Sequence, residues 1–200
     1  MRFGLIILYP VLVHLGVVFA QVSIQVLAIL ALTTGICLGD LIARKPSTWA
    51  LYSLIVAGLS GMFFLDKTIY LLYIPPILIP LLMFIGFFRT LLPGQIPLVT
   101  DIGTKARGTL TQDMQNYTRV ITQLWAACFA AMTTWALVLP IMGSLTLWSI
   151  FTNIVNHVLV GTFFVGEYCY RRYRFKDHDH PSFFAYLQIV VKSIRGEKSD

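Results

Sequence analysis

The sequence predicts an all-α fold, a polytopic membrane helical bundle of about six transmembrane helices followed by a cytoplasmic interfacial amphipathic helix. Hydrophobic residues make up 57% of the 200 residues and charged residues 12%, against about 45–50% and about 25% in soluble globular chains. Uncharged runs long enough for a membrane-spanning helix also recur along the chain. This pattern excludes a soluble domain, and three cysteines are too few for a disulfide scaffold.

Six segments are long and apolar enough to span a bilayer. The first uncharged run is too long for one helix, and a short polar group near residue 23 marks a turn within it. The third span stops at Asp66-Lys67, and the fourth stops at Arg89. The predicted spans are residues 3–20, 23–40, 49–65, 69–88, 120–141 and 145–168, which together form a transmembrane domain over residues 1–170.

The basic residues gather on one side of this six-span arrangement. Of the 15 Lys and Arg residues, all but Lys67 fall in the N-terminus, the even-numbered loops or the C-terminal tail. The positive-inside rule therefore predicts a multi-pass membrane protein with both termini in the cytoplasm. One alternative stays open, because Val18-Phe19-Ala20 resembles the end of a signal peptide. Cleavage after Ala20 would leave five spans.

Small residues recur at a spacing of four in the second span, at Ala31, Gly35 and Gly39. Such residues allow helices to approach closely in lipid. Packing within the bundle is the simpler interpretation, and a homodimer face is the alternative.

Three prolines, Pro75, Pro76 and Pro80, lie in the fourth span. Each removes a backbone donor and frees a carbonyl four residues earlier, on Leu71, Leu72 and Pro76 itself. The outer half of this span is expected to be kinked or broken, and a broken helix would line a cavity. A simple kink packed against neighbouring helices is the other interpretation.

Polar side chains near the predicted midplane form a candidate buried polar site. His14 lies in the first span and His157 in the sixth. On a regular α-helix Asn153, Asn156 and His157 share one face, because they are separated by three and four residues. The site is interpreted either as a proton-handling or head-group-binding site or as simple interhelical hydrogen bonding. No metal-ligand or nucleophile–base spacing occurs, so we expect no metal and no cofactor, and catalytic residues are unknown.

Near the cytoplasmic end of the sixth span, Glu167 lies four residues before Arg171. This spacing favours an ion pair at the membrane interface. A catalytic carboxylate is the less favoured interpretation of Glu167.

The cytoplasmic stretch 89–119 contains too many prolines and glycines to be one helix, and helical periodicity resumes near Thr109. Its apolar residues predict that it lies on the membrane surface or dips into it. It is interpreted as a passive connector or as a substrate or partner site, and Tyr117 and Trp125 lie where an aromatic belt is expected. The candidate site residues of this stretch are Arg89, Asp101, Lys105, Arg107, Tyr117, Arg119 and Trp125.

The tail, residues 171–200, is basic and ends in an apolar helical stripe. Pro181-Ser182 is a helix start signal, and Gly196 is a stop signal. We expect residues 182–195 to form an amphipathic helix on the anionic cytoplasmic leaflet, with membrane lipids as partners. Because the basic residues are spread along membrane edges, nucleic-acid binding is not expected.

Three segments of the chain resemble a known family: FRTLLPGQIPLVT from Phe88 to Thr100, YTRVIT from Tyr117 with Trp125, and Glu167-Tyr168 with Arg171-Arg172. They are similar to an uncharacterised family of small bacterial inner-membrane proteins, encoded among acyl-carrier-protein, ketosynthase and acyltransferase genes of aryl-polyene-type pigment clusters. The similarity covers most of the chain. The family usually has a basic residue where this chain has Asp101. The resemblance implies a context in lipid biosynthesis and no catalytic residue.

Three functions fit these observations. The first is an accessory protein that docks cytosolic acyl-chain-building enzymes or acyl carrier protein through the basic loop and tail, because acyl carrier proteins are usually acidic. No catalytic motif is found, which favours this role over an enzyme. The second is a membrane enzyme that transfers or modifies an acyl or aryl lipid, using the loop with Asn153 and His157. The third is a small lipid or pigment translocator that uses the proline-containing fourth span.

Overall fold

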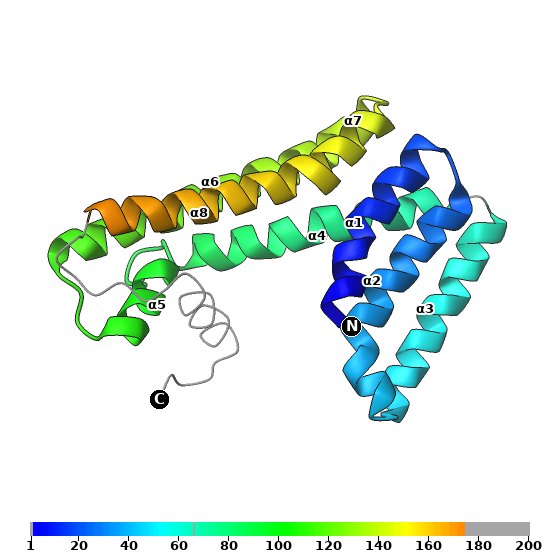
Figure 1. The fold of residues 1–200 in the computed structure, drawn as a ribbon, viewed down its shortest axis with the longest axis horizontal. Helices are drawn as coiled ribbons and strands as arrows, with labels where there is room; N and C mark the ends of the chain where they lie inside the picture. Colours follow the sequence, from blue (N-terminus) through cyan, green and yellow to red (C-terminus); the bar gives the residue numbers. More distant parts are fainter. Residues whose placement is uncertain (1, 66, 175–200) are drawn as a thin grey trace. The chain divides into compact units, whose positions relative to one another are not determined.

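The computed structural model describes residues 2–65 and 67–174, and these residues are all-α with no strand (Figure 1). The predicted all-α fold class is confirmed for this part of the chain. The amphipathic helix predicted at 182–195 lies outside the described residues. The elements are α1 (Arg2–Val18), α2 (Val22–Ile42), α3 (Pro46–Phe64), α4 (Thr68–Arg89), α5 (Leu98–Arg107), α6 (Gln112–Ile141), α7 (Leu145–Ile150), the π-helix η1 (Phe151–Val155) and α8 (Asn156–Arg174).

Five of the described helical segments are long and apolar enough to cross a membrane. They are α2, α3, α4, α6 and the continuous run from Leu145 to Arg174, while α1 is apolar but shorter. These lengths agree with a membrane-spanning protein. The predicted span 120–141 is the apolar part of α6, which begins at Gln112, near the point where the sequence predicted that helical periodicity resumes. The first two turns of α6 are polar.

The helices form two compact units, and each is described by itself. Unit 1 combines Met1–Ile79 with Met132–His157, and unit 2 combines Pro80–Ala131 with Val158–Asp200. Consequently α4, α6 and the run from α7 to α8 each contribute residues to both units.

Local sequence explains where the helices of unit 1 begin and end. α3 begins at Pro46, and proline suits a first helical turn because it has no N–H to leave unpaired. Between α6 and α7 the chain turns through Gly143, whose φ of +76° is readily adopted only by glycine. The Ser144 hydroxyl then accepts a hydrogen bond from the Leu147 N–H at 3.4 Å and caps α7.

In unit 1, α1 packs along α2, and α3 packs against the other side of α2 (Figure 1). A close approach at Gly16 joins α1 and α2, because a Cβ there would lie 2.9 Å from Gln25 Cγ. Of the small residues singled out above on α2, Ala31 and Gly35 are buried. The buried hydrophobic core of the unit consists of Tyr9, Val13, Ala28, Ile29, Leu32, Leu59, Leu72 and Trp148.

The three prolines do not break α4, which runs as continuous helix from Thr68 to Arg89. The expectation of a broken fourth span is therefore wrong. Pro76 has no N–H to offer the carbonyl of Leu72, but the buried Tyr9 hydroxyl of α1 donates to that carbonyl at 3.4 Å. A partner on the neighbouring helix thus satisfies a backbone acceptor that the proline leaves without its helical donor.

This contact predicts the outcome of a double-mutant cycle. Tyr9→Phe should lower the free energy of unfolding by about 1 kcal/mol, because it removes the donor to a buried carbonyl. Pro76→Ala supplies a helical N–H to the same carbonyl, so Tyr9→Phe in that background should cost much less. Unfolding of the detergent-solubilised protein, followed by circular dichroism, measures both values. Equal costs in the two backgrounds would contradict the assignment.

Candidate functional site

The stretch 89–119 lies in unit 2, where its middle part folds into helix α5. The stretch is tied to the end of α4 through Thr90. The Thr90 hydroxyl donates to the carbonyl of Phe87 at 2.7 Å and accepts from the N–H of Leu98 at 3.0 Å. The first residue of α5 is therefore held against the last turn of α4.

Two threonines of α6 hold α5 from the other side. The Val99 N–H donates to the Thr122 hydroxyl at 3.3 Å, and the hydroxyls of Thr100 and Thr118 lie 2.7 Å apart. Thr118 and Thr122 also donate to carbonyls one turn earlier on α6, and both side chains are buried. These contacts make α5 a fixed part of unit 2 rather than a loose connector. The sequence alone does not connect Thr100 with Thr118 and Thr122, because their contacts join different helices.

The two faces of α5 differ in character. Ile102 is buried, whereas Asp101 and Lys105 form an ion pair of 2.7 Å on the outer side. Such an exposed pair contributes about 0.2–1 kcal/mol. Asp101 and Lys105, both candidate site residues, thus lie together on the surface of α5.

Glu167 of α8 lies buried between two partners from unit 2. Its Oε1 accepts from the Tyr117 hydroxyl at 3.3 Å and lies 3.5 Å from Arg171 Nε, so the predicted ion pair is formed. The exposed fraction of Glu167 is only 8%, so its carboxylate is buried. Spacing within one helix identifies the Arg171 contact, but Tyr117 reaches Glu167 from α6, which the sequence alone does not indicate.

Aromatic rings contact both polar partners of this carboxylate. The rings of Tyr117 and Tyr170 stack with centroids 5.8 Å apart, and the Arg171 guanidinium lies 5.9 Å from the centre of the Tyr168 ring. Water has little access to such a site, so the carboxylate interacts strongly with its two polar partners.

Trp125 lies inside unit 2. Its exposed fraction is 8%, and its ring contacts Phe87 of α4, Phe129 of α6 and Phe163 of α8, with centroids 6.1, 5.4 and 4.5 Å away. Trp125 therefore packs three helices together.

Four exposed arginines lie at or near helix ends of unit 2. Figure 1 shows that the last turn of α4, the start of α6 and the end of α8 lie toward the same end of the unit as α5. Arg89 is the last residue of α4, and Arg119 lies two turns into α6. Arg172 and Arg174 lie in the last turn of α8. We call these four residues the basic rim. Candidate residue Arg107 ends α5, but its side chain lies outside the described part. An exposed group of cations attracts anionic lipid head groups or an acidic protein.

The candidate polar site of unit 1 is formed in part. His14 Nδ1 of α1 lies 3.0 Å from the hydroxyl of Ser149, which is fully buried. Asn153 donates to the Ser149 carbonyl at 3.0 Å and to the Thr152 hydroxyl at 3.1 Å. His14 and Asn153 thus meet through Ser149, a residue that sequence reasoning missed because one serine in an apolar run is common.

The other two residues of that candidate site lie elsewhere. Asn156 is buried but accepts a hydrogen bond from Trp135 Nε1 at 2.9 Å, and His157 is exposed. The prediction of one shared face assumed a regular α-helix, whereas residues 151–155 form the π-helix η1. The wider π turn changes the direction in which the following side chains point. Sequence periodicity does not reveal such a turn.

No group of three or more His, Cys, Asp or Glu side chains within the described residues is arranged to hold a metal ion. The polar cluster of unit 1, which joins His14, Ser149 and Asn153, is hydrogen-bonded and contains no carboxylate, whereas unit 2 has a buried carboxylate and the basic rim.

The threonine contacts predict how α5 responds to mutation. Thr122→Val keeps the shape of the side chain but leaves the Val99 N–H without an acceptor. Hydrogen exchange of the α5 amides should become about tenfold faster, which corresponds to about 1.4 kcal/mol of lost local stability. Thr109→Val, an exposed position before α6, is the matched control and should leave exchange unchanged. Equal exchange in the two variants would show that Thr122 does not hold α5.

Comparisons of the chain with models of known protein families, with characterised proteins and with solved structures find no match. The geometry and charge of the two sites therefore provide the structural basis for a functional proposal.

Proposed function

We propose that the protein is an inner-membrane accessory protein that docks an acidic cytosolic partner, acyl carrier protein or an acyl-chain-building enzyme, at the basic rim of unit 2. The observation that carries this proposal is the fixed position of α5. Three sets of threonine contacts hold it against α4 and α6, next to exposed arginines. A preformed surface loses less conformational entropy on binding than a flexible loop does.

The class of partner follows from charge and from the resemblance to proteins of aryl-polyene-type clusters. Arg89, Arg119, Arg172 and Arg174 present positive charge at one end of the unit. Complementary charge increases the association rate and favours acidic partners over basic ones. Acyl carrier protein combines acidity with a role in acyl-chain biosynthesis, so it is the partner that we propose.

This role requires that the basic rim faces the cytoplasm, so we also propose six spans with both termini on that side. The asymmetry of Lys and Arg supports this topology, and α1 would be the short first span.

Cysteine labelling tests the topology. In a variant without the three native cysteines, Lys67→Cys should react with an impermeant maleimide added outside the inner membrane. Arg44→Cys, in the loop between α2 and α3, should react only after the membrane is opened. The reverse pattern would contradict the proposed orientation.

Binding in neutral phosphatidylcholine nanodiscs tests the docking function. The double variant Arg89→Glu/Arg119→Glu should bind acyl carrier protein at least tenfold more weakly, because attraction becomes repulsion at the rim. The affinity of the unmodified protein should also fall as salt is added. Lys67→Glu reverses a charge outside unit 2 and is the matched control. Equal binding by both variants, with unchanged thermal unfolding midpoints, would refute the proposal.

A second candidate function is a membrane enzyme that transfers an acyl chain, and the buried Glu167 with its Tyr117 and Arg171 contacts favours it. Acyl carrier protein carrying a radiolabelled acyl chain distinguishes the two functions in the same nanodiscs. An enzyme would move label into lipid, and Glu167→Gln would stop this transfer while binding persists. The translocator hypothesis relied on a broken fourth span, and α4 is continuous.

A further inference from the structure

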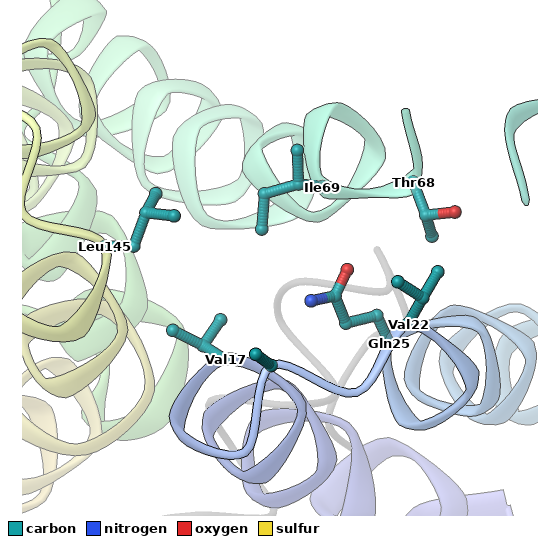
Figure 2. A pocket seen from close by; sticks show the side chains of 7 residues that line it. Val17, Val22, Gln25, Thr68, Ile69 and Leu145 are labelled. Atoms are coloured by element: carbon teal, nitrogen blue, oxygen red, sulfur yellow. The ribbon is translucent and has the colours of Figure 1, made fainter. Parts of the chain in front are cut away.

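A hollow of about 240 Å³ lies in unit 1, where the ends of helices meet. Figure 2 shows the side chain of Gln25 extending from α2 into this space. The neighbouring wall residues are apolar except for Thr68 at the start of α4. We call this space the Gln25 pocket, and the lining residues used below are Val17, Val22, Gln25, Thr68, Ile69 and Leu145.

Gln25 supplies the main polar group of the pocket. Its exposed fraction is 7%, and its Nε2 donates to the carbonyl of Gly16 at 3.3 Å. A glutamine amide has a second N–H and an oxygen acceptor. Within the described residues the Gln25 side chain forms no further hydrogen bond. The close approach at Gly16 fixes this orientation, because a Cβ there would collide with Gln25 Cγ.

Thr68 supplies the second polar group. Its exposed fraction is 1%, and within residues 2–65 and 67–174 its hydroxyl has no hydrogen-bond partner. Threonine at the start of a helix commonly caps a backbone N–H, but this hydroxyl does not. A buried hydroxyl without a partner is unfavourable. The Thr68 oxygen is closed to a water-sized molecule in this orientation of the side chain, so the hydroxyl reaches the pocket by a rotation about χ1 of Thr68.

The composition of the pocket limits the class of ligand. None of the lining residues is charged, so an ionised head group would be buried without a countercharge. Amide and hydroxyl groups both donate and accept, so the matching ligand group also does both, as an alcohol does. The apolar walls fit a hydrocarbon, and the volume equals that of about eight water molecules at about 30 Å³ each.

We propose that the Gln25 pocket binds the hydroxyl head of a neutral amphiphile, an alcohol attached to an apolar chain. In the six-span topology the helix ends around the pocket lie at the outer membrane boundary, where such head groups are found. The inference rests on the pocket residues and is independent of docking at the basic rim.

Photolabelling of the full chain in phosphatidylcholine nanodiscs tests the proposal. The probe is a diazirine derivative of 1-octanol, and crosslinked residues are identified by mass spectrometry. Label should concentrate on Val17, Val22, Gln25 or Ile69. Unlabelled 1-octanol and monooctanoylglycerol should compete, whereas glycerol, which has no chain, and octyl methyl ether, which has no donor, should not. Equal competition by glycerol or by the ether would overturn the proposal, and so would label spread evenly over the outer faces of the helices.

Variants separate binding from folding. Gln25→Leu should reduce labelling of the pocket at least tenfold, and Gln123→Leu, the same change at an exposed position of unit 2, should leave it unchanged. Thr68→Val removes a hydroxyl that has no partner in the described residues, so labelling should fall without any decrease in the thermal unfolding midpoint. If Thr68→Val and Gln25→Leu both label like the unmodified protein, the pocket does not recognise the alcohol.

Discussion

A polar group inside a membrane-spanning protein is stabilised by a partner within the protein, and this tendency explains much of the structure. Lipid offers no hydrogen bonds, so a backbone group that loses its helical partner must find another. The Leu72 carbonyl, which Pro76 deprives of its donor, finds the hydroxyl of Tyr9 on α1. The contact explains how α4 can contain prolines without ending, and it links α1 to α4 within unit 1.

The same requirement shapes unit 2 through threonine and glutamate. The hydroxyl of a threonine in a helix can donate a hydrogen bond to the carbonyl one turn earlier, which leaves the hydroxyl oxygen available as an acceptor. Thr122 accepts from the α5 backbone in this way, so a side chain that is ordinary within a helix becomes an attachment point. Burying a carboxylate such as Glu167 costs more free energy than burying a hydroxyl. The hydroxyl of Tyr117 on α6 and the guanidinium of Arg171 on the same helix both contact it.

The two units offer different chemistry. Unit 1 contains the His14–Ser149 contact and the neutral amide of Gln25, each beside apolar core. Unit 2 combines a buried carboxylate with exposed arginines. Neutral groups suit ligands that enter from lipid, because binding them requires no burial of charge. Cations at a helix end suit partners that arrive from water, where charge acts over a distance of about 10 Å.

The sequence by itself determined the helical class and the approximate spans, because hydropathy and length depend only on local composition. It also determined the Glu167–Arg171 pair, since four residues make one turn of a single helix. Contacts between helices were decided only by the tertiary structure, as Tyr117 with Glu167 and His14 with Ser149 illustrate. The surroundings of Asn156 and His157 were also decided by the tertiary structure, because Trp135 of α6 donates to the Asn156 side chain while His157 is exposed. Burial of Trp125 likewise depended on rings from three helices that are distant in sequence.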